Sequence, residues 1–202
     1  MIIDFIEIGT SDFNTLIQNT DDNTIGFSIE PIKFYLDRLP NKKNVEKVNM
    51  AISNNDNDLK IYYISSQNIE KYNLPSWVKG CNSVNNYHPT VLKLIKSKNI
   101  KENEIFCCQT VKCRTLYQFM TNKKITELKF LKIDTEGHDT VILNKFIDDI
   151  IKNNQYKLLP KKIQYESNIL SNQIELNKLN QRLKMLKYKI KSKSDDTILE
   201  LS

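Results

Sequence analysis

Residues 130–139 read Phe130-Leu131-Lys132-Ile133-Asp134-Thr135-Glu136-Gly137-His138-Asp139. The apolar residues up to Ile133 predict a buried strand, and three acids, a histidine and a glycine follow it directly. Apolar residues then recur at helical spacing from Asp139 to Asn153, which predicts an amphipathic helix with an acid near its N-terminus. A buried strand, a polar turn and a helix in this order indicate an α/β protein.

Strands alternate with helices on both sides of this stretch. Before it, the pattern predicts strands at Ile2–Ile8, Thr24–Ile29, Val45–Ile52, Leu59–Ile64 and Ile105–Val111, and helices at Phe13–Asn19, Ile32–Leu39 and Leu116–Met120. After it come a strand at Lys162–Glu166 and a helix from about Ser171. The alternation predicts a mostly parallel central sheet with helices on both faces.

The end of the chain has two interpretations. Leu176, Leu179, Leu183, Leu186 and Ile190 follow one another at three- and four-residue steps, which extends the last helix to Ile190. Alternatively, residues 188–190 and 197–201 form an antiparallel pair of strands. The leucine spacing also resembles a coiled-coil seam, but a parallel sheet needs helical cover, so we expect this helix to pack on its own sheet and the protein to be a monomer.

Length and composition limit the class of protein. The 202 residues fit one domain, 1–202. The net charge of +6 comes from lysines scattered along the chain, with only three arginines, so a nucleic-acid partner is not favoured. Four irregularly spaced cysteines give no zinc pattern, and we predict no metal site. The sequence shows no signal peptide and no long apolar run, so we expect a cytoplasmic protein without a membrane partner.

The first two predicted strands suggest a nucleoside-binding unit. The first strand runs into Glu7-Ile8-Gly9-Thr10-Ser11, where a glycine turn lets the backbone approach a ligand closely. The second strand ends in Ile29-Glu30-Pro31, which places an acid where it would bind a ribose diol. By themselves these features are equally compatible with a tight turn at Gly9 and a helix cap at Glu30.

Residues 131–143 add a more specific signal. Together with Glu7-Ile8-Gly9, Ile29-Glu30-Pro31 and residues 49–53 (Asn-Met-Ala-Ile-Ser), they make the chain resemble the FkbM family of S-adenosylmethionine-dependent methyltransferases. The resemblance implies a Rossmann-like class I methyltransferase fold. Ser11 and Phe13 depart from the family, whose members generally carry an asparagine and a further glycine there.

The resemblance also assigns roles to individual residues. It implies S-adenosylmethionine as the cofactor, with the turn of Glu7, Gly9, Thr10 and Ser11 on its methionine side and Glu30 on its ribose. Met50, Ala51 and Ile52 would lie near the adenine. Asp134, Glu136 and His138 would face the transferred methyl group, Asp134 also touching the cofactor.

Methyl transfer to a hydroxyl needs alignment and a base that accepts the hydroxyl proton. His138 is the first candidate for this base, because an unperturbed imidazole titrates near neutral pH. Asp134 would then hold the acceptor or the donor's amino group, and it shares a side with Glu136 if the strand stays extended. The polar loop 77–89 is a candidate acceptor pocket or lid, with His88 as a second acid–base candidate.

We therefore predict an S-adenosylmethionine-dependent methyltransferase that methylates a hydroxyl oxygen on an acceptor of unknown identity. Two other functions stay open. One is a catalytically silent methyltransferase fold that binds the donor or a partner in an assembly. The other is an RNA-directed methyltransferase or a basic accessory module, which a positively charged groove beside His138 would favour.

Overall fold

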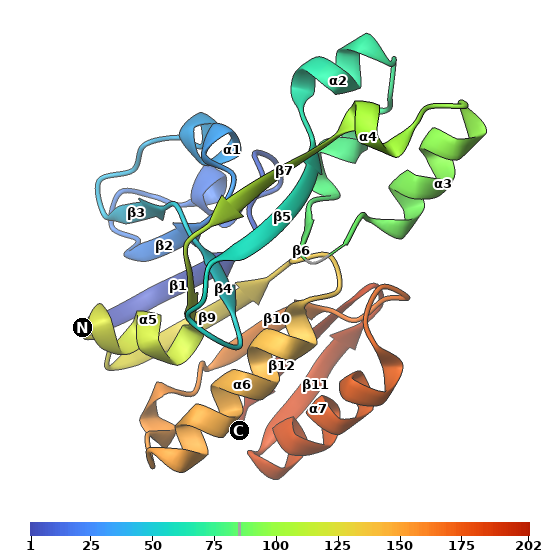
Figure 1. Ribbon diagram of the computed structural model, residues 1–202. Helices are drawn as coiled ribbons and strands as arrows, with labels where there is room; N and C mark the ends of the chain where they lie inside the picture. The colour runs from blue at the N-terminus through green and yellow to red at the C-terminus, as the bar shows by residue number, and fades with distance from the viewer. Residues whose placement is uncertain (85) are drawn as a thin grey trace. The chain divides into compact units, whose positions relative to one another are not determined.

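The computed structural model describes residues 1–84 and 86–202, and its contacts divide the chain into two units (Figure 1). Unit 1 comprises Met1–Asn57 and Lys112–Ser202, and unit 2 comprises Asp58–Val111. Every residue of the predicted cofactor site and of the 130–139 stretch belongs to unit 1, whereas the 77–89 loop belongs to unit 2. That the chain works as one domain stays a prediction.

Unit 1 is built on a seven-stranded sheet in the order β11-β12-β10-β9-β1-β2-β3. Its strands are β1 (Ile2–Ile8), β2 (Gly26–Ile29), β3 (Val45–Val48), β9 (Glu127–Ile133), β10 (Lys162–Glu166), β11 (Tyr188–Lys193) and β12 (Asp196–Leu201). Neighbours from β3 to β10 are parallel, while β12 is antiparallel to both β10 and β11. The α/β prediction is confirmed, but the sheet is mixed because the chain returns through a hairpin at its end.

Helices cover this sheet on both faces. They are α1 (Lys33–Arg38), α5 (Leu116–Asn122), α6 (Asp139–Lys152) and α7 (Gln173–Met185), with 3-10 turns η1 (Leu16–Asn19) and η3 (Tyr156–Leu158). Ile6 belongs to the apolar cluster that includes α5, α6 and α7, while Phe5 packs with Ile17 of η1 and Leu36 of α1. Because successive strand residues point to opposite faces, the two clusters lie on opposite sides of the sheet.

Two elements of unit 1 differ from the sequence prediction. The strand predicted at Val45–Ile52 ends at Val48, and β4 (Ala51–Ser53) pairs instead with β8 (Cys113–Thr115) in a separate two-stranded sheet. The helix predicted at Phe13–Asn19 is reduced to η1, because Asn14 has a φ of 54°, in the left-handed region where a right-handed helix cannot continue. At the end of the chain, the antiparallel strand pair is the correct alternative.

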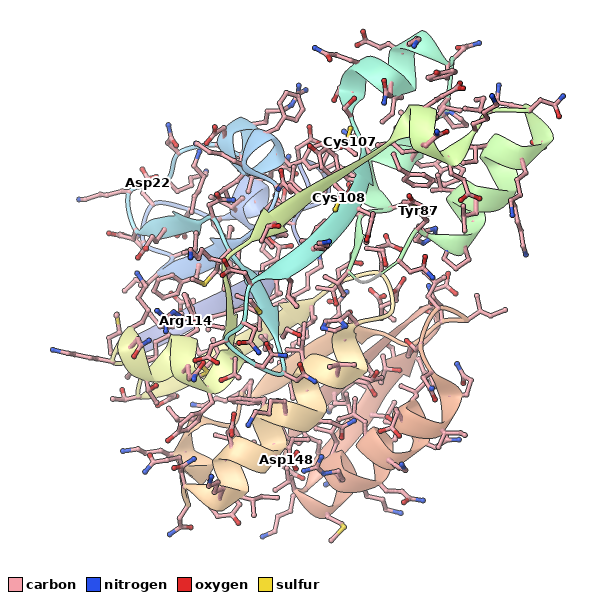
Figure 2. The ribbon with its side chains drawn as sticks, viewed as in Figure 1. Asp22, Tyr87, Cys107, Cys108, Arg114 and Asp148 are labelled. Atoms are coloured by element: carbon pink, nitrogen blue, oxygen red, sulfur yellow. The ribbon has the colours of Figure 1, made fainter. Side chains whose placement is uncertain are left out.

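Unit 2 contains a three-stranded sheet of β6 (Ser83–Val84), β5 (Leu59–Ile64) and β7 (Phe106–Val111). Its helices are α2 (Ser66–Lys71), α3 (Pro89–Ser97) and α4 (Glu102–Ile105), with a 3-10 turn η2 (Ser76–Gly80). The sequence analysis predicted none of these helices. Cys107 and Cys108 are neighbours on β7, and Tyr87 stacks on Phe106 with ring centroids 4.1 Å apart (Figure 2). Asn85, inside the predicted loop, lies outside the described residues.

No helix in the described part of the chain is both long enough and apolar enough to cross a membrane.

Candidate functional site

The carboxyl ends of β2, β1 and β9 lie side by side in unit 1. Backbone hydrogen bonds continue past the strands: the Gly9 amide donates to the Ile29 carbonyl over 3.0 Å, and the Asp134 amide donates to the Ile8 carbonyl over 2.9 Å. Gly9, Glu30 and Asp134 therefore occupy three adjacent positions at one edge of the sheet. After β1 the chain forms β2 on one side of β1, and it later forms β9 on the opposite side of β1. Open α/β sheets bind ligands at the point where the strand order reverses in this way.

Gly9 is required at this edge by a contact within the chain. Its φ is 80°, and a Cβ atom built on it would lie 1.9 Å from the carbonyl oxygen of Asp134. Only glycine combines this backbone conformation with so close a neighbour. The close approach expected from the sequence therefore exists, but its partner in the structure is the β9 end of the same sheet.

Glu30 links the β1 turn to the start of α1. Its carboxylate accepts hydrogen bonds from the backbone amides of Ser11 and Ile32, both over 2.8 Å. Burial raises the pKa of Glu30 to about 7, and the charge of Asp12 raises it further, while the amide hydrogen bonds lower it. Thr10 gives the carboxylate a third backbone hydrogen bond. A carboxylate has about four acceptor positions, so three amides leave capacity for a ribose hydroxyl. The cap and the ribose ligand are thus compatible roles.

The remaining residues of the β1 turn are tightly held. Glu7 is fully buried, forms an ion pair with Lys132 on β9 over 2.8 Å and accepts a hydrogen bond from the Leu16 amide. Burial raises the pKa of Glu7, against the lowering effect of Lys132. Thr10 and Ser11 are also buried, and Ser11 has a φ of 47°. Glu7 thus positions the turn through its contacts with Leu16 and Lys132. A direct contact between Glu7 and the cofactor stays a prediction.

The residues predicted near the adenine lie on or beside β4. Ala51 and Ile52 are buried, and Ile52 belongs to the main apolar cluster of unit 1, against which the half-buried Met50 also packs. Next to them, the Ser53 hydroxyl lies 2.8 Å from Nε2 of His138. This contact ties β4 to the turn between β9 and α6. The adenine contacts themselves stay a prediction.

The turn after β9 does not continue the strand. Glu136 has a φ of 54°, so the extended geometry that would align it with Asp134 ends after Ile133, and the expectation of a shared side fails. Asp139 holds the turn instead. Its carboxylate accepts hydrogen bonds from the amide and hydroxyl of Thr135 and, over 2.7 Å, from the Glu166 amide on β10.

Four carboxyl groups gather where β9 and β10 end: Asp134, Glu136, Asp139 and Glu166. We call them the acid cluster. Burial is the main cause that raises the pKa of Asp139 to about 6 and of Glu166 to about 8, and neighbouring acids contribute. Glu166 accepts a hydrogen bond from the Gly137 amide over 2.8 Å. Because these carboxylates repel one another, a cation nearby would be stabilised.

Asp134 differs from the other members by its access to solvent. Its side chain is exposed at the sheet edge, while protein atoms surround it on its other sides. This desolvation raises the pKa of Asp134 to about 7, with contributions from the charges of Asp139 and Glu136 and an opposing one from Lys132. An accessible carboxyl that titrates near neutral pH is suited to accept a proton.

His138 is the residue just before α6, and burial lowers its pKa to about 4. Its imidazole is therefore neutral at physiological pH, and a group with so low a pKa is too weak a base to take a proton efficiently near pH 7.

The low pKa of His138 can be tested by an NMR titration. We expect the His138 imidazole to stay neutral down to about pH 4, and we expect its signal to be missing in His138→Asn. Since burial is the cause, Ser53→Ala should leave this pKa below 6.5, the ordinary value. A His138 midpoint near 6.5 in the intact chain would contradict the assignment.

The comparison with known protein families settles the family. A model of the methyltransferase FkbM domain matches residues 7–190, which is most of the chain. The chain belongs to this family. None of the curated proteins compared with it gives a significant match. The matched region of this FkbM domain contains every predicted site residue, all of unit 2 and all of unit 1 except residues 1–6 and 191–202.

Two residues of the FkbM domain site were missed by the sequence analysis. Glu166 is the last residue of β10 and Glu30 directly follows β2, so the rule applied to Glu30, an acid at the carboxyl end of a strand, could have found Glu166. Ser53 ends β4, and nothing in its sequence neighbourhood indicates the contact with His138, 85 residues away. His88 is the buried residue that precedes α3 in unit 2; its acid–base role stays a prediction.

Proposed function

We propose that this FkbM methyltransferase domain uses S-adenosylmethionine to methylate a hydroxyl oxygen, on a class I methyltransferase fold. The observation that carries the proposal is the adjacency of the Gly9 turn, Glu30 and Asp134 at the ends of β1, β2 and β9. The donor set fits the cofactor. Glu30 offers an acceptor for ribose hydroxyls, and the acid cluster offers negative charge for a sulfonium and an ammonium group.

The residues of the chain divide the work of the reaction. When bound, S-adenosylmethionine supplies a methyl group on a positively charged sulfur, which leaves as a neutral thioether when the methyl moves to the acceptor oxygen. Asp134 takes the hydroxyl proton, because it is accessible and its pKa of about 7 leaves much of it ionised at neutral pH. Asp139 and Ser53 hold the turn that presents Asp134 and His138.

The surroundings of His138 bear on the RNA-directed alternative. The turn that carries His138 also carries Glu136 and Asp139, and these acids would repel a phosphate backbone. This arrangement favours an uncharged or cationic acceptor near Asp134. The nature of the acceptor remains part of the proposal.

Calorimetry with S-adenosylmethionine and S-adenosylhomocysteine tests the cofactor directly. We expect both to bind, and adenosine to bind more weakly because it lacks the amino-acid part. Transfer of a labelled methyl group to hydroxyl-bearing acceptors, giving a product stable to mild base as an ether is, tests the reaction. Binding without transfer to any acceptor would favour the catalytically silent alternative, and the absence of binding would overturn the proposal.

Glu30→Ala should weaken S-adenosylmethionine binding by about 1.5–3 kcal/mol, the range for hydrogen bonds to a charged group. The variant also deprives the Ser11 and Ile32 amides of their acceptor, so its stability must be measured alongside. Glu30→Gln keeps one acceptor oxygen, so its affinity for S-adenosylmethionine should lie between those of the wild type and Glu30→Ala. Glu46→Ala removes an exposed acid on β3 and serves as the control. Equal affinity in a folded Glu30→Ala protein would remove Glu30 from the site.

Binding of S-adenosylmethionine should strengthen as the pH rises from 6 to 8. Glu30 and Asp134 both have a pKa raised to about 7, and their charged forms are the ones that accept from ribose and attract the sulfonium. Each carboxyl that must ionise contributes roughly a tenfold change in Kd over this interval. S-adenosylhomocysteine lacks the sulfur charge, so its Kd should change less. A pH-independent Kd for the charged donor would contradict the role of both carboxyls.

A further inference from the structure

A groove lies beside β11, the edge strand of the unit 1 sheet that is four strands away from β1. It has a volume of about 770 Å³ and is lined by α7, β11, the end of β12 and the residues between and after them. Its apolar part comes from Tyr188, Ile190 and Leu199, and Ile190 leaves 56% of its surface exposed. Figure 1 shows α7 and β11 side by side at this margin.

The charged side chains that line the groove are all basic. Lys184, Lys187 and Lys189 line it, and no acidic side chain does. Within the described part of the chain none of these three lysines forms an ion pair, although many other lysines do. An apolar floor bordered by unpaired lysines is complementary to a ligand that combines apolar and acidic groups.

β11 adds a directional feature to this groove. It is the last strand of the described sheet and pairs only with β12, so its outer side presents backbone groups that a further strand can use. The pairing shifts in register between Ile190 and Ser192. The regular part of the edge, Tyr188 to Ile190, is therefore the part that lines the groove.

Two simpler explanations account for less. Lysines and a bulge on an edge strand prevent aggregation, but that purpose is served without an apolar groove and a half-exposed isoleucine beside them. A second copy of the chain would bring Lys189 and its neighbours against the same lysines across a two-fold axis, and like charges facing each other destabilise a strand pair.

We propose that this groove binds an extended acidic peptide segment of a partner protein, which adds as a strand along β11. Apolar side chains of the segment pack on Ile190, and its carboxylates face Lys184, Lys187 and Lys189. The proposal is independent of the methyltransferase reaction, since it involves neither the β1 turn nor the acid cluster.

The test uses fluorescence anisotropy with a labelled ten-residue peptide of alternating glutamate and valine and the full chain. We expect saturable binding that weakens as salt is raised. The triple variant Lys184→Glu, Lys187→Glu, Lys189→Glu should weaken it roughly tenfold or more. Ile190→Ser removes an exposed apolar side chain without changing the charge of the groove, should fold, and should weaken binding as well. The matched control reverses three exposed lysines elsewhere in unit 1: Lys43, Lys152 and Lys157.

Two further peptides define the mode of binding. A peptide with lysine in place of glutamate should not bind, and one with proline at alternate positions should bind weakly because it cannot pair with β11. Equal binding of either peptide, or an unchanged affinity in the groove variants, would overturn the proposal. So would a dimer in light scattering that the triple variant dissociates, or binding to phosphatidylserine vesicles without binding to the acidic peptide.

Discussion

Asp134→Asn should lower methyl transfer by about 10²–10⁴-fold, the contribution of a positioned general base. Asparagine has nearly the same size as aspartate but cannot take a proton from a hydroxyl at neutral pH. In the wild type, kcat should rise with pH as Asp134 ionises near its pKa of about 7, and in the variant this rise should disappear. Single-turnover rates across pH 5–9 measure both effects. Asp22→Asn, at an exposed position far along the chain, is the matched control (Figure 2).

The same experiment separates Asp134 from His138 as the base. If His138 accepted the proton, the rise in rate would lie near pH 4, where its pKa has been lowered by burial, and kcat would be flat between pH 6 and 8. His138→Ala would then carry the large loss, and Asp134→Asn only the weaker donor binding. Loss of turnover in both variants with the pH 7 rise retained in His138→Ala would still support Asp134, with His138 as a positioning residue.

The acids at the sheet edge also make the stability of the folded state depend on pH. The direction of this dependence follows from the direction of their pKa shifts. Glu30 and Glu166 hold protons to higher pH in the folded state than in the unfolded chain. The folded state therefore binds more protons between about pH 4 and pH 8, and its stability falls as the pH rises through that window. A bound cation would reduce this loss by stabilising the ionised carboxyls.

The elements that sequence predicts best are those whose pattern is local and uninterrupted. Local patterns correctly predict two strands and one helix: the apolar runs at Ile2–Ile8 and 128–133 become β1 and β9, and the helical spacing after Asp139 becomes α6. Burial against a sheet requires such patterns whichever elements are the neighbours. The break after Val48 is different. β4 leaves the main sheet to pair with β8, about 60 residues later, and no local pattern encodes that partner.

The candidate site shows the same limit at the level of single residues. Sequence placed Glu30 and Asp134 at strand ends, and parallel neighbours bring those ends together. The sequence does not show that the Asp139 carboxylate accepts hydrogen bonds from Thr135 and Glu166 while the Asp134 side chain is exposed to solvent. That difference depends on where β10 lies. Sequence also assigned His138 its ordinary pKa, since the burial that lowers the value comes from packing.

Gly9→Ala should destabilise unit 1 more than Gly137→Ala, the same substitution at the other glycine that the structure gives a positive φ. A non-glycine residue held at unfavourable dihedral angles costs about 1–3 kcal/mol, and forcing an extra carbon into packed surroundings costs about as much again. In Gly9→Ala both apply, because φ is 80° and the new Cβ would lie 1.9 Å from the backbone oxygen of Asp134. That sum is a large share of the roughly 5–15 kcal/mol that keeps a domain folded.

Gly137→Ala is the matched comparison for this prediction. Its φ of 89° imposes a similar strain, but its Cβ would lie 2.7 Å from the nearest atom, the Leu170 oxygen, so its free energy of unfolding should fall by less. Urea denaturation followed by circular dichroism measures both. Where Gly9→Ala still folds, the β1 turn must move away from Asp134, so donor affinity and turnover should drop together in that variant. A Gly9→Ala protein as stable and active as the wild type would show that the ends of β1 and β9 do not need this contact, and the assembly of the site from adjacent strand ends would have to be abandoned.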